Sequence, residues 1–500
     1  MRSTDRDRFF RLVAWAKSQG GSLDPRVEIY RDETTKFSLR VREDDRTQES
    51  LARLRAGDRI ASCTTSMTLS YLNAIIDSPL ASTWWEEPAS PAFPARFMEM
   101  NPSHVIGRFF LIQQYLKGED SFWSTYIETL PQPEHLSSWS LPAFWPSEDA
   151  AWLAQTNAAG SVEEMQGIVS RDYKKARMLL KEASFPGWQG YTRLLYNWAF
   201  CIFTSRSFRP SLVLSAETMD RVAAMLPDGC KLDDFSLLLP VFDIPNHSPT
   251  ARVTWDAAAD PTSVHFRVEQ EYKPGNQIFN NYGMKTNSEL LLAYGFVLPE
   301  TEALHNDYIH LRKRTQAEGS QAGAVDEKDI RDFVISLRPL SHPSSLIGRS
   351  RQFPVLEGFP SISPRFGHFE DALLWDLCFH LAVADEKAAM EVMASSEDQN
   401  TSDWNIRHHQ SQLLSRVLRA DPAPEFLELS KRVKETLVTK LTLDYDRLLE
   451  AGVEAEADAE EEDFSLNQSL ALQYRKQCAK VLKNAIMALD SEAALSRQEA

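Results

Sequence analysis

The sequence predicts an α+β chain of more than one domain, and three observations support this class. Alternating apolar and polar residues, the pattern of half-buried strands, occur in two separate stretches, residues 27–70 and 230–300. The stretch between them, residues 71–229, has mostly helical spacing, and after residue 310 the spacing is helical alone. The length of 500 residues also exceeds the ~100–200 residues of an ordinary domain.

Short strands are expected in both alternating stretches. In the first, Val27 and Ile29 alternate with charged residues, as do Phe37, Leu39 and Val41. In the second, strands are expected at residues 253–255, 264–268 and 278–279. The Lys-Pro-Gly-Asn sequence at 273–276 predicts a turn, because proline presets φ and glycine accepts a positive φ.

Helices are expected where apolar residues recur every three or four positions. The N-terminal region, residues 1–26, contains an amphipathic helix with Arg11 inside its apolar stretch, which argues against a signal peptide. The other expected helices cover residues 104–116, 191–203, 288–294, 426–448 and 466–489. An acidic run at 454–463 separates the last two, and the polar stretch 312–326 is interpreted as a linker.

Composition and charge exclude several classes of protein. Hydrophobic residues make up 43% and charged residues 25%, which is typical of globular chains and excludes collagen-like or wholly disordered ones. The net charge of −17 argues against direct nucleic-acid binding and favours a basic protein partner. No apolar stretch approaches the ~18–20 residues of a membrane span, so no membrane association is expected.

The cysteines are few and scattered. There are five, with no C-x-x-C pair: Cys63, Cys201, Cys230, Cys378 and Cys478. A disulfide scaffold or a zinc ribbon is therefore not expected, and neither is any other metal site. A reducing compartment, the cytoplasm or the nucleus, is the simple expectation, and we expect a monomer.

The common phosphate-binding, dinucleotide-binding, serine-hydrolase and zinc-protease motifs are missing from the sequence. Two segments remain as candidates, Asp243–Ser248 and Asn281–Phe296. Taken alone, the first is a proline turn after a buried strand, in which His247 is an ordinary half-buried histidine. The second alone is a strand, a Tyr-Gly turn and a capped helix with aromatic core residues.

Taken together, the two segments resemble the SET-domain methyltransferases. The pattern is Asp-x-x-Asn-His-Ser, then a Pro-Gly turn, then Tyr-Gly-x-x-x-Asn-x-Glu-Leu-Leu-x-x-Tyr-Gly-Phe. It is similar to the branch of the plant Rubisco large-subunit and fungal ribosomal-protein lysine methyltransferases. Residues 204–208 resemble that branch's Ser-Arg-x-Phe element, and residues 119–131 its Ser-x-Trp-x-x-Tyr…Leu-Pro element. Tyr474-Arg475 resembles part of its helical substrate-binding domain.

The resemblance implies a split SET domain of short strands that interlock in a pseudoknot. Residues 27–70 and 230–300 would form its core, and residues 71–229 a helical insert. An all-helical substrate-binding domain would follow at residues 310–500.

The resemblance also implies an S-adenosylmethionine-dependent protein-lysine N-methyltransferase with Tyr282 as its catalytic phenol. The cofactor would be bound by Arg206 at its carboxylate, Asn246 at its methionyl end and His247 near its adenine, with Tyr282 facing its sulfonium. Tyr294 would form a wall of the substrate channel, to which Asp243 would belong as a structural anchor. The acceptor lysine must be neutral to react, although its free pKa is ~10.4. A channel with apolar, aromatic walls suits the reaction because it disfavours the ammonium form.

One stretch departs from the pattern of the branch. A Gly-x-Gly sequence usually lies between its first two strands, but residues 34–39 read Thr-Thr-Lys-Phe-Ser-Leu here. A catalytically inactive SET-like scaffold for a protein partner therefore stays open as an alternative, as does a protein-histidine methyltransferase. Many histone-directed SET enzymes close the lysine channel with a cysteine-bound zinc after the domain, and no cysteine cluster follows Phe296 here, so the resemblance implies a non-histone substrate. The acidic charge suits a basic ribosomal or translational protein.

Overall fold

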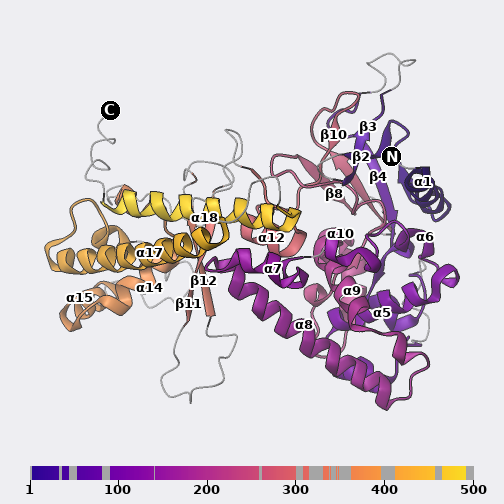
Figure 1. The fold of residues 1–500 in the computed structure, drawn as a ribbon, viewed down its shortest axis with the longest axis horizontal. Coiled ribbons are helices and arrows are strands. Elements are labelled where there is room, and N and C mark those ends of the chain that lie inside the picture. The colour runs from indigo at the N-terminus through magenta and orange to yellow at the C-terminus, as the bar shows by residue number, and fades with distance from the viewer. Residues whose placement is uncertain are drawn as a thin grey trace. The chain divides into compact units, whose positions relative to one another are not determined.

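The computed structural model describes residues 3–32, 36–43, 53–80, 90–139, 141–257, 262–299, 308–314, 330–336, 338, 345, 347, 362–395, 412–456 and 464–490. The chain divides into two compact units (Figure 1). Unit 1 comprises Met1–Phe144, Glu163–Gly283 and Ala293–Gly295. Unit 2 comprises Trp145–Val162, Met284–Leu292 and Phe296–Ala500.

Unit 1 contains three small antiparallel sheets. Their strand orders are β1-β4-β9-β8, β10-β3-β2 and β5-β7-β6. The strands are β1 (Ser22–Leu23), β2 (Val27–Asp32), β3 (Lys36–Val41), β4 (Arg59–Thr64), β5 (Leu69–Ser70), β6 (Ser207–Phe208), β7 (Leu237–Leu238), β8 (Val253–Asp256), β9 (Ser263–Val268) and β10 (Gln277–Ile278). The first two sheets each join strands from both alternating stretches of the sequence, as a split core requires.

The register of these sheets follows from the alternation in the sequence. Val27 pairs with Val41, and Leu39 pairs with both Ile29 and Ile278. Val27, Leu39, Val41 and Ile278 are fully buried, so one face of the β10-β3-β2 sheet belongs to the core. A shift of one residue would expose these side chains, which fixes the register.

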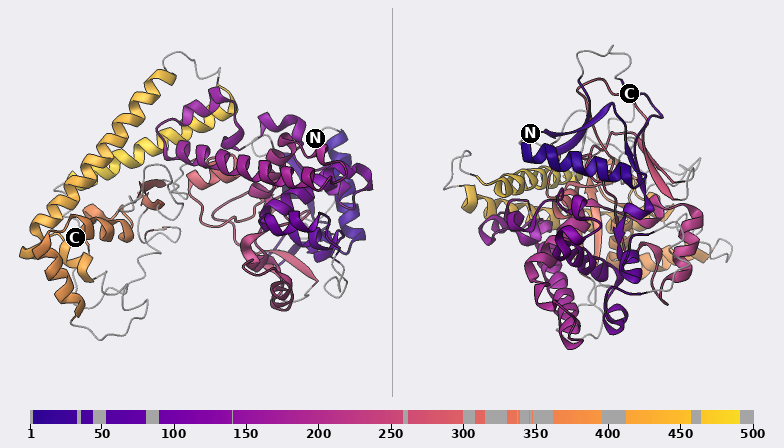
Figure 2. Two further views of the ribbon diagram at one scale, coloured as in Figure 1. Left: turned by 90° about the horizontal axis from the view of Figure 1, so that it is seen from below. Right: turned by 90° about the vertical axis from the view of Figure 1, so that its right-hand side faces the viewer.

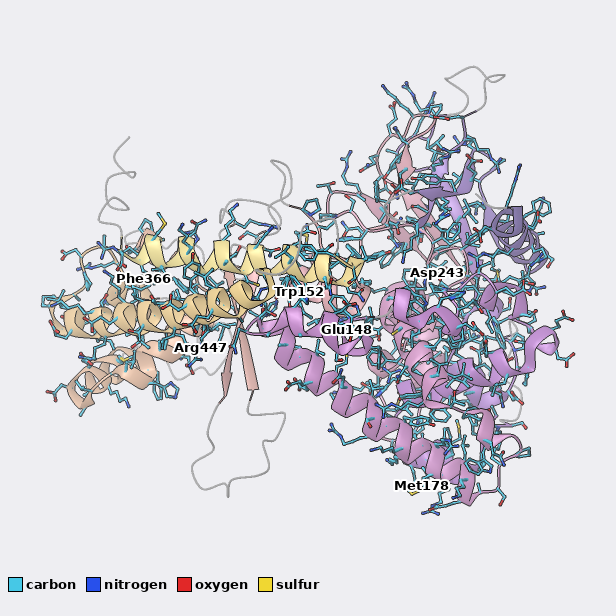
Figure 3. The ribbon with its side chains drawn as sticks, in the orientation of Figure 1. Glu148, Trp152, Met178, Asp243, Phe366 and Arg447 are labelled. Carbon is cyan, nitrogen blue, oxygen red and sulfur yellow. The ribbon has the colours of Figure 1, made fainter. Side chains whose placement is uncertain are left out.

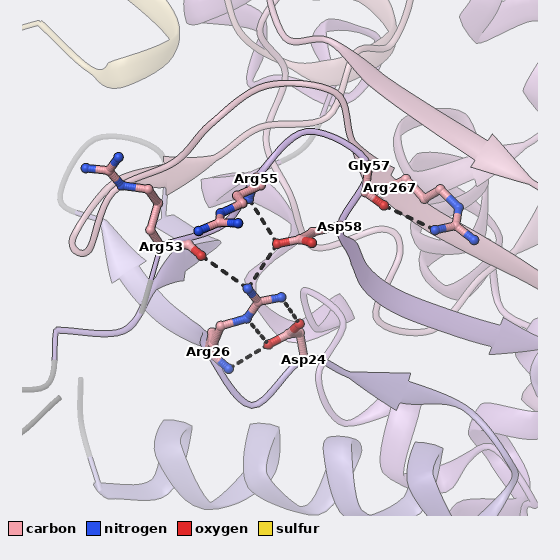
Figure 4. A network of polar contacts seen from close by, with 7 residues as sticks. All are labelled: Asp24, Arg26, Arg53, Arg55, Gly57, Asp58 and Arg267. Carbon is pink, nitrogen blue, oxygen red and sulfur yellow. Dashed lines mark hydrogen bonds and ion pairs between the residues drawn. The ribbon is translucent and has the colours of Figure 1, made fainter. Parts of the chain in front are cut away.

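A charged network ties the loop before β2 to the turn before β4 (Figure 4). The Arg26 guanidinium contacts Asp24 at 2.7 Å and Asp58 at 2.9 Å, and it donates to the carbonyl of Arg53 at 3.1 Å. The Arg26 charge and hydrogen bonds outweigh burial and lower the pKa of Asp24. Asp58, in the turn before β4, thereby anchors the loop that precedes β2.

Helices of unit 1 surround these sheets. They are α1 (Ser3–Ser18), α3 (Tyr71–Ile76), α4 (Ala95–Met100), α5 (Ser103–Lys117), α6 (Ser124–Ile127), α9 (Arg193–Arg206), α10 (Pro210–Val213), α11 (Ala216–Met225) and most of α8 (Asn157–Glu182). The N-terminal α1, indigo in Figure 2, packs against β1 and α6. Helix α9 begins after the N-cap Thr192 and buries Trp198 and Phe203 among other apolar residues, which confirms the helix expected at residues 191–203.

Unit 2 is mainly helical. It contains α7 (Ser147–Ala150), the 3₁₀ helix η6 (Ala151–Leu153), most of α12 (Asn287–Tyr294), α14 (Asp371–Leu381), α15 (Ala384–Ser395), α17 (Leu427–Glu456) and α18 (Leu466–Asp490). Helices α17 and α18 pack against each other and confirm the two periodic stretches in the sequence. Trp152, labelled in Figure 3, meets Phe464 with ring centroids 5.0 Å apart.

The structure corrects the expectation that residues 310–500 are entirely helical. Strands β11 (Tyr308–Arg314) and β12 (Ile330–Ser336) pair along seven residues in an antiparallel ladder. The buried Ile309, Phe333 and Ile335 give this ladder one apolar face, a period-two pattern too short to compete with the long helical signal around it. Most of the predicted linker and acidic run, residues 315–326 and 457–463, lies outside the described residues.

The two units also divide the chain differently from the expected domains. Residues 145–162, expected in the helical insert, and residues 284–292, expected in the SET core, belong to unit 2. Residues 145–162 are tied to the rest of unit 2 by Asp149, whose carboxylate accepts hydrogen bonds from Ser465 at 3.0 Å and Asn467 at 2.8 Å. No helix that the structure describes is both long enough and apolar enough to cross a membrane.

Arg475 in α18 generates a stability prediction. It is 5% exposed, and its guanidinium donates to the backbone carbonyls of Trp152, Ala154 and Leu448. Arg475→Ala removes these bonds from a charged donor, so we expect it to lower the free energy of unfolding by at least ~1.5–3 kcal/mol.

Urea unfolding followed by circular dichroism measures this loss. Lys483→Ala is the matched control, because Lys483 is exposed on the same helix and its loss is expected to change stability by less than ~0.5 kcal/mol. Equal stability of the two variants would contradict a structural role for Arg475.

Candidate active site

The two candidate segments of the sequence meet in unit 1 through backbone hydrogen bonds. Asn280 donates its N–H to the carbonyl of Asn246 at 2.8 Å, and Ser248 donates to the carbonyl of Asn280 at 2.9 Å. His247 and Asn280 form a parallel bridge. The Asn-His sequence is thereby fixed beside the Asn-Asn-Tyr-Gly sequence, as the resemblance implies.

Three aromatic rings stack at this junction. The Tyr282 ring lies 4.9 Å from the His247 ring at 17°, and 4.9 Å from the Tyr294 ring at 27°. The backbone N–H of Tyr282 donates to Nδ1 of His247 at 3.1 Å, so a neutral His247 carries its proton on Nε2. Gly283 follows with φ at +98°, a conformation that glycine adopts without strain.

The phenol of Tyr282 is held in place and stays protonated. Its hydroxyl donates to the carbonyl of Pro245 at 2.9 Å. Burial raises the pKa of Tyr282 far above its ordinary value, although the Arg206 charge opposes the shift. A neutral phenol of this kind donates one hydrogen bond and keeps lone pairs that can accept another.

Arg206, at the C-terminal end of α9, is held by Asp243. Its Nη1 donates to the Asp243 carbonyl at 3.0 Å and contacts the Asp243 carboxylate at 3.3 Å. Tyr126 donates its hydroxyl to the same carboxylate at 3.0 Å. The Asp243 side chain is only 2% exposed, and burial raises its pKa although Arg206 and Tyr126 act in the opposite direction. Asp243 is therefore an anchor that orients Arg206.

A cavity of about 430 Å³ lies against Arg206, Asp243 and Asn246. Its size is in the range of small-molecule sites. The other lining residues are Arg8, Phe9, Arg31, Lys36, Phe37, Thr129, Leu130, Pro131, Gln132, His135, Trp139 and Ile244. His247, Tyr282 and Tyr294 do not line it, but the Tyr282 phenol is close enough to Arg206 and Asp243 for their charges to act on its pKa.

The resemblance pointed to Arg206, Asp243 and Asn246 at this site but not to the contribution of the N-terminal helix. Phe9 packs on Phe37 with ring centroids 4.7 Å apart, and Arg8 lies over the same ring at 5.2 Å. The amphipathic pattern of residues 1–26 identifies Phe9 as buried, but a helical period does not say what its apolar face will cover. Arg31 and Trp139 carried no signal in the sequence.

The stretch that lacks the expected glycines is only partly described, since Thr34 and Thr35 lie outside the described residues. Phe37 turns its ring toward α1, and its carbonyl accepts from Nδ2 of Asn246 at 3.4 Å. Lys36 has φ at +66°, the left-handed conformation that glycine adopts most readily.

Within the described residues, no three His, Cys, Asp or Glu side chains gather as metal ligands do.

Comparisons with known proteins identify the relatives of this chain. No protein-family model matches it. It is 31% identical over 223 residues to the ribosomal lysine N-methyltransferase set10 of Schizosaccharomyces pombe, covering 43% of this chain and 36% of that protein. It is 26% identical over 261 residues to the actin-histidine N-methyltransferase of Drosophila melanogaster, covering 48% and 44%. The chain thus spans less than half of the length of these curated relatives.

Solved structures show the same fold along almost the whole chain. The SET domain of LSMT bound to methyl-lysine and AdoHcy aligns with a TM-score of 0.59 at 15% identity, covering 98% of this chain and 93% of that one. Rubisco LSMT bound to AdoMet aligns with a TM-score of 0.57 at 14% identity, covering 97% and 91%. The chain therefore has the fold of Rubisco LSMT, and over part of its length its sequence is similar to protein methyltransferases.

Proposed function

We propose that this chain is an S-adenosylmethionine-dependent protein methyltransferase that binds its cofactor in the cavity beside Arg206. One observation carries the proposal. Asp243 engages only Nη1 of Arg206 among the described residues, so the other guanidinium N–H groups are left for a ligand at a cavity of about 430 Å³. The names of the matched relatives, a ribosomal lysine N-methyltransferase and a protein-lysine N-methyltransferase, support the methyltransferase activity.

The cavity fits the chemical groups of this cofactor. The Arg206 guanidinium would bind the cofactor's carboxylate in a charge-assisted pair. Asn246 would bind the polar methionyl end through its side-chain amide. The apolar surfaces of Phe37, Leu130 and Trp139 suit a flat, uncharged adenine. The cofactor supplies an electrophilic methyl group on a sulfonium.

The stacked aromatic residues would bind and orient the methyl acceptor. Tyr282 would accept a hydrogen bond from the acceptor amine, because its own proton is directed at Pro245 and its raised pKa keeps it neutral. A charged phenolate at this position would stabilise the ammonium form of the acceptor. A neutral phenol does not, so the acceptor ammonium can lose a proton and become the reactive amine. The ring of Tyr294 would complete an apolar wall that disfavours the charged form of the acceptor.

Lysine is the proposed acceptor, and a basic non-histone protein the proposed substrate. The set10 match has the higher identity of the two curated relatives above, and the matched protein-lysine N-methyltransferase EFM1 of Saccharomyces cerevisiae is 32% identical over 101 residues. The net charge of −17 suits a lysine-rich ribosomal or translational protein, and we place the reaction in the cytoplasm or the nucleus. Histidine is the second candidate, since actin-histidine N-methyltransferases are also relatives.

The first prediction from the proposed function concerns cofactor affinity. Asn246→Ala and Arg206→Lys are each expected to weaken AdoHcy binding by about one to two decades, because each loses hydrogen bonds to charged or polar groups. Lysine is chosen at position 206 because alanine would leave the buried Asp243 carboxylate without its cation.

Thermal-shift titration with AdoHcy measures both variants against Arg209→Ala, an exposed arginine three residues away. The Arg209 variant should bind as the wild type does. Wild-type affinity in both site variants would remove these residues from the cofactor site.

The second prediction concerns the chemistry at Tyr282. Tyr282→Phe is expected to bind AdoHcy almost normally and to lose methyl transfer by about 10²-fold or more, the usual effect of removing one preorganised polar group. The assay follows tritium from labelled AdoMet into a lysate of cells that lack this protein, because the substrate is unidentified.

Tyr173→Phe is the matched control, since the Tyr173 hydroxyl also donates to a backbone carbonyl, that of Tyr191 at 3.2 Å, away from the cavity. It should label the lysate at the wild-type rate. Acid hydrolysis of the labelled protein, followed by chromatography of the released amino acids, then distinguishes methyl-lysine from methyl-histidine. Full-rate labelling by Tyr282→Phe would contradict the catalytic role, and no labelling by the wild type would favour the scaffold alternative.

A further inference from the structure

Lys36 departs from the resembled pattern in both residue type and backbone conformation. It begins β3 and lines the cavity, with φ at +66°. A residue with a Cβ is strained in this region relative to ordinary backbone conformations. Glycine would adopt the same turn without that strain, so the fold alone does not explain a lysine here.

The charges around Lys36 identify what its side chain could bind. As a whole residue Lys36 is exposed, yet protein atoms crowd its ammonium group, and together with the nearby Arg206 and Arg31 charges they lower its pKa. Arg8 at the same cavity is paired with Asp5 at 3.2 Å. Lys36, Arg31 and Arg206 are therefore three cations that repel one another around one space.

The lining residues do not supply a free anion to relieve this repulsion. Asp243 is the one carboxylate among the described residues that line the cavity, and Arg206 and Tyr126 already occupy it. An anionic group of a ligand placed between Lys36 and Arg206 would be stabilised by both charges. This end of the cavity thus favours a ligand with an anionic group, such as a carboxylate.

We propose that Lys36 is a specificity-determining residue that binds the carboxylate of the cofactor's amino-acid moiety together with Arg206. This inference rests on the proposed function, since it assumes that AdoMet and AdoHcy enter this cavity. In place of the close backbone approach that glycine permits, the side chain would supply a charge contact. Lys36 would then add affinity for AdoHcy without adding affinity for ligands that lack the carboxylate.

Two ligands and three variants separate this role from a packing role. AdoHcy carries the carboxylate, whereas 5′-methylthioadenosine keeps the adenosine and the thioether but lacks the amino-acid moiety. Lys36→Met keeps length and bulk without charge, Lys36→Arg keeps the charge, and Lys36→Gly removes the side chain. Each full-length variant is titrated with both ligands by calorimetry, and its melting temperature is compared with that of the wild type.

Lys36→Met is expected to weaken AdoHcy binding by about 10-fold or more and to leave methylthioadenosine binding unchanged, because only the first ligand loses a charged partner. Lys36→Arg, which keeps the charge, should retain most of the wild-type affinity for AdoHcy. Increased salt should weaken AdoHcy binding more in the wild type than in Lys36→Met, since a partly exposed charge pair is screened.

Three outcomes would overturn the inference. Unchanged AdoHcy affinity in Lys36→Met would show that the ammonium does not contact the ligand. Equal losses for both ligands would show a packing role, and tighter binding of both ligands by Lys36→Gly would show that Lys36 obstructs the cavity. In all three the wild type binds AdoHcy and the proposed function stands, whereas a wild type that does not bind AdoHcy overturns both.

Discussion

The candidate site depends on the backbone pairing between residues 246–248 and residue 280. Its two hydrogen bonds, at 2.8 and 2.9 Å, join segments that are more than thirty residues apart in the sequence. They fix the side chain of Asn246 at the cavity and place Tyr282 against His247. Without this pairing the phenol of Tyr282 would have neither its stacking partner nor the Pro245 carbonyl that directs its proton.

A second constraint acts on Arg206, which lines the same cavity. Asp243 is buried and contacts both Arg206 and Tyr126. Burial of its carboxylate costs desolvation free energy, and the two contacts fix the orientation of the Arg206 guanidinium. The cost is visible in the raised pKa of the Asp243 carboxyl. Because Asp243 uses only one end of the guanidinium, Arg206 is held in orientation and is still able to bind a ligand. In the proposed function, this division of one arginine between an anchor and a ligand is the feature that would let the cavity bind the cofactor.

Local patterns in the sequence predicted the elements of the fold well. The steps of three and four in α17 and α18, and the alternation in β2 and β3, report burial directly, so these elements follow from the sequence. Packing partners were harder to predict, because a period identifies a buried face but not its neighbour. The inclusion of residues 145–162 in unit 2 and the contact of Phe9 with Phe37 both depend on contacts distant in sequence.

The site residues were predicted through the resemblance to the SET-domain methyltransferases. The structure brings Arg206, Asp243 and Asn246 to one cavity and stacks the rings of His247, Tyr282 and Tyr294. The residues that surround this cavity without a motif of their own, such as Arg31 and Trp139, were not predictable. Lys36 is intermediate: the sequence showed that the glycine was missing, but its left-handed backbone and its two cationic neighbours required the structure. The departure is therefore as informative about this chain as the matching motifs.

Equilibrium dialysis of the full-length protein against radiolabelled AdoMet tests the central claim most directly. The account predicts saturable retention of about one equivalent of label per chain, displaced by unlabelled AdoHcy, because one cavity holds the cofactor beside Arg206 and Asn246. Retention that AdoHcy does not displace, or no retention at concentrations that saturate other methyltransferases, would contradict it.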